Sequence, residues 1–147
     1  DLDIISDCAP LNDLTEILFE NITGIRIMRD PTRGGLATTL NEFLDGNRFG
    51  MRISEESVPI RDVVLGLCEP LGFDPFYLAN EGKVVVVVAE KSADKALQTM
   101  RSHPLGQNAA IIGEVITKPA GHVLLKTRIG PERVLDMLTG EMLPRIC

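Results

Sequence analysis

The sequence predicts an α+β fold in which helices and a mixed β-sheet form packed layers. Two observations support this class: some segments repeat apolar residues at helical spacing, and others are short runs rich in β-branched residues. These patterns follow one another in no strict β-α-β order, and the sequence has no internal repeat. A chain of 147 residues can form one domain whose core needs neither disulfides nor metals.

The first third of the chain predicts helix, strand, loop and helix in turn. Residues 10–22 place leucines and an isoleucine at helical spacing, with Asn12 or an upstream polar residue as the expected cap. Residues 25–28 alternate as a strand does. After a loop, residues 36–50 resume a helical pattern that a glycine, Gly46 or Gly50, should end.

The middle third predicts a short strand, a short helix and a buried strand. Residues 50–54 are the strand candidate, and residues 61–72 form the helix, which Pro70 and Gly72 should close. Residues 84–89 are almost all valine, a composition typical of a strand covered on both faces. We expect this strand to be central in the sheet.

The last third predicts one helix followed by strands. Residues 92–104 have a helical pattern, with Ser92 as the expected cap. Residues 108–116 and 122–128 are strand candidates joined by a turn that contains proline and glycine. Residues 131–138 fit either a helix or a strand, and we interpret them as a strand.

Composition excludes several classes of function. The net charge of −6 and pI near 4.9 argue against a broad nucleic-acid surface, which is normally basic. The longest apolar run is far shorter than a membrane span and the first residues are acidic, so we expect a cytoplasmic protein. The cysteines and histidines lack the spacing of a zinc site, and we predict no metal ligand. Because the chain does not begin with Met, we expect an N-terminal part to be missing.

The first candidate site is the segment MRDPTRGGLA, where a strand end leads through adjacent glycines into a helix. Gly34 and Gly35 would let backbone N–H groups approach an oxyanion, and the helix N-terminus adds partial positive charge. Arg33 offers a forked contact, Thr32 a hydroxyl, and Asp30 a carboxylate that holds either a metal or the loop. The alternative is an ordinary strand-to-helix turn.

The second candidate is Glu81, which lies between Asn80 and Gly82 directly before the valine-rich strand. We expect its carboxylate at the edge of a cleft, where it would serve as a base. The alternative is a solvated carboxylate in a turn.

The third candidate is Cys147, the last residue of the chain. The segment from Gly140 to Cys147 gives the thiol an extended reach of about 23–25 Å, which suits a swinging carrier arm. The alternative is a frayed terminus without function. Cys68, on an apolar helix face, is interpreted as a core residue rather than a nucleophile.

These three stretches together resemble the C-terminal part of the HypE family of hydrogenase maturation factors, which belongs with aminoimidazole ribonucleotide (AIR) synthetase and selenophosphate synthetase. The resemblance extends over essentially the whole chain and depends on the combination of MRDPTRGGLA, NEG and the terminal LPRIC. It implies an ATP-dependent carbamoyl dehydratase that converts a carbamoyl group on the Cys147 thiol to a thiocyanate. The product would supply cyanide ligands for the iron of nickel-iron hydrogenase.

The resemblance also implies a domain division and roles for particular residues. Residues 1–139 would be the AIR-synthase-related C-terminal domain and residues 140–147 a flexible tail. Glu81 matches the glutamate that orients or deprotonates the carbamoyl group. The loop facing the nucleotide phosphates would consist of Asp30, Thr32, Arg33, Gly34 and Gly35.

The resemblance further implies partners and cofactors. HypF would attach the carbamoyl group, and the HypC–HypD complex would receive the cyano group. ATP and Mg²⁺ would bind mainly to an N-terminal domain and the second copy of a homodimer, so little turnover is expected from this chain alone. Two alternatives remain: a non-catalytic docking or dimerisation module, and a sibling amide-activating synthetase acting on a free substrate, which has no need of a terminal cysteine.

Overall fold

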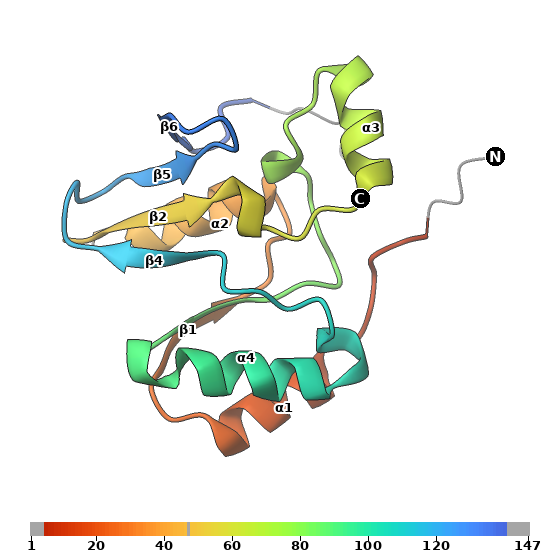
Figure 1. The fold of residues 1–147 in the computed structure, drawn as a ribbon, viewed down its shortest axis with the longest axis vertical. Coiled ribbons are helices and arrows are strands. Elements are labelled where there is room, and N and C mark those ends of the chain that lie inside the picture. Colours follow the sequence, from red (N-terminus) through yellow and green to blue (C-terminus); the bar gives the residue numbers. More distant parts are fainter. Residues whose placement is uncertain (1–4, 47, 141–147) are drawn as a thin grey trace.

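The computed structural model describes residues 5–46 and 48–140 and confirms the α+β class. Helices and a mixed sheet form the upper part of the molecule, and two further helices lie below a small second sheet (Figure 1). The helices are α1 (Asn12–Asn21), α2 (Gly35–Leu44), α3 (Asp62–Leu71) and α4 (Ala93–Ser102). The strands are β1 (Ile25–Arg29), β2 (Gly50–Ser54), β3 (Val85–Val88), β4 (Gly113–Ile116), β5 (Val123–Lys126) and β6 (Glu132–Val134).

The larger sheet has the order β4-β2-β5-β6 and is mixed, as predicted. Strand β2 runs parallel to β5 and antiparallel to β4, and β6 pairs antiparallel with β5. Alternation sends Met51 and Ile53 into the core, whereas Arg52 between them donates hydrogen bonds to Glu114 and Glu132 on the neighbouring strands. The segment at residues 131–138 thus contains a strand, as interpreted from the sequence.

A large hydrophobic cluster fills the space between this sheet and α2. Its members share almost complete burial and come from α2, β2, β5 and the segments at Phe76 and Leu135. They are Leu36, Ala37, Leu40, Phe43, Leu44, Met51, Ile53, Phe76, Val123, Leu125 and Leu135. We call this group the large cluster.

The valine-rich strand β3 is not the central strand that the sequence predicted. Among the described residues it pairs only with β1, antiparallel, in a two-stranded sheet. The prediction that both of its faces are covered is confirmed. Val85 and Val87 pack against the large cluster, whereas Val86 and Val88 pack against a second cluster on the other side.

This second, small cluster lies below the β1–β3 sheet, where α1 and α4 are neighbours (Figure 1). Its buried members are Leu18, Ile22 and Ala96. The predicted caps of these helices differ from the structure: α1 follows Leu11 without a side-chain cap. Ser92 does precede α4, but its hydroxyl donates to the Thr23 carbonyl at 2.7 Å and so connects α4 to the α1–β1 loop.

Helix α3 stands at the margin of the upper part of the molecule (Figure 1). It continues one residue past Pro70 and ends at Gly72, whose φ of +68° suits glycine at this position. Cys68 is buried, as the sequence indicated, and is the residue of α3 that reaches the interior. Over the residues that the structure describes, no helix has the length and apolar character needed to cross a membrane.

Candidate functional site

The glycine loop and the turn around Glu81 lie at the same end of the β1–β3 sheet. In the antiparallel register Arg29 pairs with Val85, so the residues that follow β1 are neighbours of those that precede β3. A backbone hydrogen bond joins the two segments directly: the Asn80 N–H donates to the Pro31 carbonyl at 3.0 Å. The structure therefore brings together two stretches that are about fifty positions apart in the sequence.

Two glycines shape the loop that leads from β1 into α2. Gly34 and Gly35 have φ values of +75° and +62°, in the left-handed region that L side chains rarely adopt. A Cβ on Gly35 would collide with the Leu78 carbonyl oxygen and lie 2.7 Å from that of Phe76. The glycines therefore allow the backbone of residues 76–78 to contact the first turn of α2, and this contact fixes the loop against the domain.

The other residues of the loop differ in exposure. Asp30 and Arg33 are exposed, and Thr32 is half-buried. The Thr32 carbonyl accepts a hydrogen bond from the Gly35 N–H at 3.1 Å, which closes the turn before the helix. Behind the loop, the Thr38 hydroxyl oxygen is buried without a hydrogen-bond partner among the described residues.

The turn at Asn80–Lys83 is closed by side chains. The Lys83 ammonium donates to the Asn80 side-chain oxygen at 2.7 Å, and the Asn80 amide donates to the Leu78 carbonyl at 2.7 Å. Glu81, at the tip of this turn, is exposed. Because Asn80 also bonds to Pro31, the position of Glu81 relative to the glycine loop is set by the backbone.

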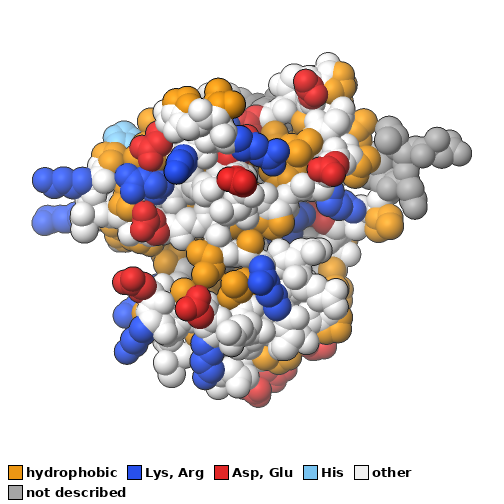
Figure 2. Space-filling view, in the orientation of Figure 1, with side chains coloured by type: hydrophobic (Ala, Val, Ile, Leu, Met, Phe, Trp, Pro, Cys, Tyr) orange, Lys and Arg blue, Asp and Glu red, His pale blue; other side chains and the backbone are white. Residues whose placement is uncertain are grey.

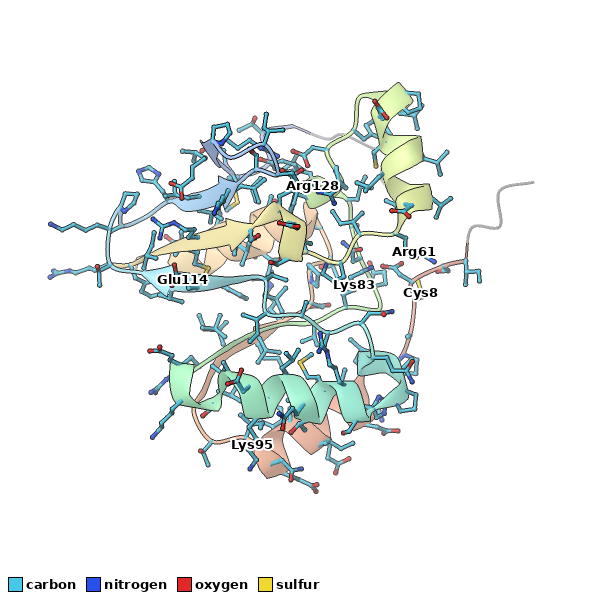
Figure 3. The ribbon with its side chains drawn as sticks, viewed as in Figure 1. Cys8, Arg61, Lys83, Lys95, Glu114 and Arg128 are labelled. Carbon is cyan, nitrogen blue, oxygen red and sulfur yellow. The ribbon has the colours of Figure 1, made fainter. Side chains whose placement is uncertain are left out.

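The N-terminal segment completes this arrangement, and the sequence did not indicate it. Cys8, Arg61 and Lys83 lie close together at one side of the molecule (Figure 3). Lys83 pairs with the Asp7 carboxylate at 3.0 Å, and the Arg61 guanidinium donates to the Ile5 carbonyl at 2.8 Å. Partial burial acts to raise the pKa of Asp7, but the hydrogen bond and charge of Lys83 outweigh it and lower this pKa below its ordinary value.

The cysteines have different surroundings. Cys147 lies outside the described residues. Burial, assisted by the negative charge of Asp74, raises the pKa of the Cys68 thiol, which favours the unreactive protonated form and agrees with its place in the core. Cys8 is exposed, next to the Asp7 contact with Lys83.

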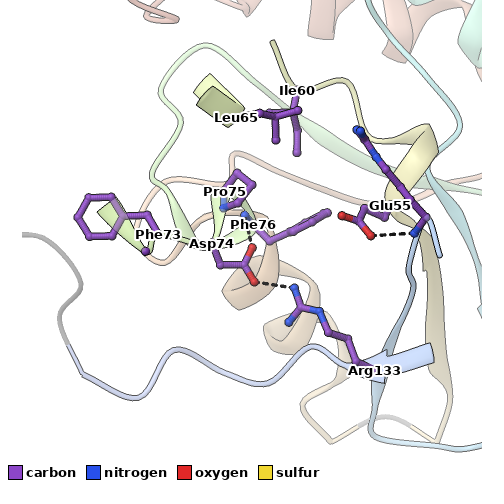
Figure 4. Close-up of a pocket in the computed structure, with 10 residues that line it drawn as sticks. Glu55, Ile60, Leu65, Phe73, Asp74, Pro75, Phe76 and Arg133 are labelled. Carbon is purple, nitrogen blue, oxygen red and sulfur yellow. Dashed lines mark hydrogen bonds and ion pairs between the residues drawn. The ribbon is translucent and has the colours of Figure 1, made fainter. Parts of the chain in front are cut away.

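A cavity lies elsewhere in the molecule, away from the glycine loop and the Glu81 turn. A hollow of about 360 Å³ lies between α3, the turn at Pro75–Tyr77 and the residues around β6 (Figure 4). Both carboxylates that line it have partners: Arg133 pairs with Asp74 at 2.6 Å, and the backbone N–H of Arg128 donates to Glu55 at 3.0 Å. None of the predicted site residues lines it.

Figure 2 shows Lys and Arg interspersed with Asp and Glu, with hydrophobic side chains exposed between the upper and lower parts of the molecule. Within residues 5–46 and 48–140, no group of three or more acidic, His or Cys side chains is arranged to bind a metal ion.

Fold and site together define an α+β domain in which a glycine-rich strand-to-helix loop meets the turn before an antiparallel partner strand. The family model described as AIR synthase related protein, C-terminal domain, matches residues 3–126. The chain belongs to this family. The carbamoyl dehydratase HypE of Cupriavidus necator is 49% identical over 147 residues, which cover 100% of this chain and 42% of that protein. The chain thus spans less than half the length of this relative.

Solved structures agree with this assignment. The hydrogenase maturation protein HypE in complex with ATP matches with a TM-score of 0.92 and 44% identity, covering 100% of this chain and 45% of that one. A chain of the HypE–HypF complex matches with a TM-score of 0.87 and 45% identity over 94% of this chain and 45% of that chain. PurL of T. maritima complexed with ATP, at 16% identity and a TM-score of 0.53 over 90% of this chain and 22% of its own, shares the fold alone.

Proposed function

We propose that the protein containing this chain is an ATP-dependent carbamoyl dehydratase. It converts a carbamoyl group on the Cys147 thiol to a thiocyanate and supplies cyanide ligands for the iron of nickel-iron hydrogenase. The observation that carries the proposal is the 49% identity to a carbamoyl dehydratase along the entire chain. The terminal cysteine adds support, because a synthetase acting on a free substrate has no use for it.

Dehydration of the carbamoyl group removes its oxygen and both protons of its nitrogen. In this proposal Glu81 accepts or orients the N–H protons, because an exposed carboxylate on a fixed turn suits a base that must contact a substrate arriving from outside. The backbone bond between Asn80 and Pro31 keeps this carboxylate beside the glycine loop. Proton removal and oxygen loss would then occur next to each other.

The glycine loop is proposed to face the nucleotide phosphates through Asp30, Thr32, Arg33, Gly34 and Gly35. Helix α2 begins without a side-chain cap, so the partial positive charge of its N-terminus is not neutralised by a capping side chain. The Thr38 hydroxyl, which is buried without a hydrogen-bond partner among residues 5–46 and 48–140, supports a polar ligand at the same place. ATP, when bound, supplies the phosphoryl group that makes the carbamoyl oxygen a good leaving group. Most ATP and Mg²⁺ contacts would come from the remainder of the protein.

Residues 1–139 are proposed as the domain and residues 140–147 as the carrier tail, whose reach of about 23–25 Å lets one thiol visit several sites. The HypE–HypF complex among the similar structures supports HypF as the partner that loads the thiol. The HypC–HypD complex is the proposed acceptor of the cyano group. A cytoplasmic homodimer is the proposed working form.

The test is mass spectrometry of the full-length protein incubated with HypF, carbamoyl phosphate and ATP. We expect a carbamoyl adduct on Cys147 that then loses one water, and no adduct on the Cys147→Ser variant. Cys8→Ser is the matched control, because Cys8 is also an exposed thiol but is not the proposed carrier. An adduct that persists in Cys147→Ser would contradict the proposal.

A further inference from the structure

We infer that Asp7 is a positioning residue for Glu81, holding the turn at Asn80–Lys83 in place from the side of the N-terminal segment. This inference deepens the proposed function and rests on it, since it concerns the same carboxylate. Asp7 is 76 positions away from Lys83 in the sequence, and no local motif connects them.

The carboxylate of Asp7 contacts the turn through Lys83. It accepts a hydrogen bond from the Lys83 ammonium at 3.0 Å, and Lys83 lies two residues after Glu81. This contact holds the C-terminal end of the turn that carries the Glu81 side chain. With only 29% of its side chain exposed, Asp7 is the less exposed member of the ion pair.

The backbone of Asp7 contacts the turn as well. A Cβ on Gly82 would collide with the Asp7 carbonyl oxygen and lie 3.0 Å from the backbone nitrogen of Ala9. Glycine at position 82 is therefore what allows the N-terminal segment to reach the turn. Lys83, the residue directly after this contact, is the one whose ammonium donates to the Asp7 carboxylate.

The contacts continue from Asp7 to the glycine loop. Lys83 donates to both Asp7 and the Asn80 side chain, and the Asn80 backbone donates to Pro31. Glu81 is thus held between the N-terminal segment on one side and the glycine loop on the other. Loss of Asp7 would free one side of the turn while leaving the bond to the loop intact, which predicts a misplaced carboxylate rather than a lost nucleotide site.

The experiment measures single-turnover dehydration by the full-length protein, already carbamoylated on Cys147, as a function of ATP concentration. Here kcat is the rate constant at saturating ATP, and KM is the ATP concentration that gives half of this rate. We expect Asp7→Ala to lower kcat by about 10- to 100-fold with little change in the KM for ATP, because a misplacement of about 1 Å costs this much. Asp7→Asn, whose side-chain oxygen can still accept a hydrogen bond from the Lys83 ammonium, should recover most of the rate. Asp94→Ala, an exposed aspartate of α4, is the matched control.

The outcomes separate this inference from the proposed function. If Glu81→Gln abolishes dehydration but Asp7→Ala has the wild-type kcat, the positioning role is wrong and the function stands. If Glu81→Gln retains the wild-type rate, the proposed role of Glu81 itself is wrong. If Asp7→Ala fails to fold, two other variants test the positioning role. A lower kcat in Lys83→Met together with a near-wild-type kcat in Asp7→Asn would support the inference. Any other combination of results would overturn it.

Discussion

The large and small hydrophobic clusters stabilise the molecule in different ways. The large cluster fills the space between α2 and a four-stranded sheet, whereas the small cluster has only a few fully buried side chains between α1, α4 and the β1–β3 sheet. Both clusters share the β1–β3 sheet, whose two faces they cover. The candidate site lies at one end of this shared sheet, so the packing of either cluster can affect its geometry.

The largest expected effect comes from breaking the contact between α2 and the segment at residues 76–78. Gly35→Ala would combine left-handed strain with a collision against backbone carbonyls, and we expect a loss of about 2–5 kcal/mol in the free energy of unfolding. Gly72 has a similar φ of +68° but no atom within 4 Å of its would-be Cβ. Gly72→Ala should therefore cost only about 1–2 kcal/mol. If urea denaturation gave the same loss of unfolding free energy for both variants, the collision at position 35 would be relieved by small movements of the backbone.

Truncating one buried leucine in each cluster tests the comparison directly. Leu125 and Leu18 are both 0% exposed, and Leu→Ala at such sites costs about 2–5 kcal/mol. We expect Leu125→Ala at the upper end, because its neighbours belong to a large set of buried side chains that cannot all move into the cavity. Leu18→Ala should lie at the lower end, because fewer buried neighbours surround it.

Hydrogen exchange distinguishes the two leucine variants further. In Leu18→Ala we expect faster exchange confined to α1 and α4, whereas in Leu125→Ala it should extend through β2 and β5. Leu105, which is 48% exposed, provides the control, and Leu105→Ala should change stability by less than about 0.5 kcal/mol. A larger loss for Leu18→Ala than for Leu125→Ala would contradict the comparison.

The helices and strands were predictable from the sequence, but several of the pairings between strands were not. Periodicity identified the helices and strands because it reports which faces are buried. It could not place β2 between β4 and β5, since those two strands are joined by a short turn and look like direct partners in the sequence. The valine-rich strand was likewise read as central, because residues covered on both faces look the same in a two-stranded sheet between two clusters.

The same distinction applies to the candidate site: its separate segments were predictable from the sequence, but their proximity was not. The glycine loop and the NEG turn were recognisable because each is a contiguous stretch with unusual backbone chemistry. Their proximity follows from the antiparallel register of β1 and β3, which no local pattern specifies. Asp7 and Lys83 were not identified for a related reason: a lysine and an aspartate 76 positions apart carry no signal until the fold brings them together.

The smallest expected effect concerns the Asp7–Lys83 pair, which belongs to neither cluster. Because the pKa of Asp7 is lowered in the folded protein, its ionisation stabilises the fold fully above the ordinary value of 3.8. That contribution is lost as the pH falls through the lower, folded pKa. For a partly exposed ion pair we expect a contribution of at most about 1 kcal/mol to the free energy of unfolding, reduced further by salt.

Urea unfolding across the acid range should therefore show a shallower pH dependence of the unfolding free energy for Asp7→Asn than for the wild type, with Asp94→Asn as the control. An unchanged slope in Asp7→Asn would mean that Lys83 does not stabilise the folded state through Asp7, and the turn would then owe its position to the backbone contacts of Gly82 and Asn80 alone.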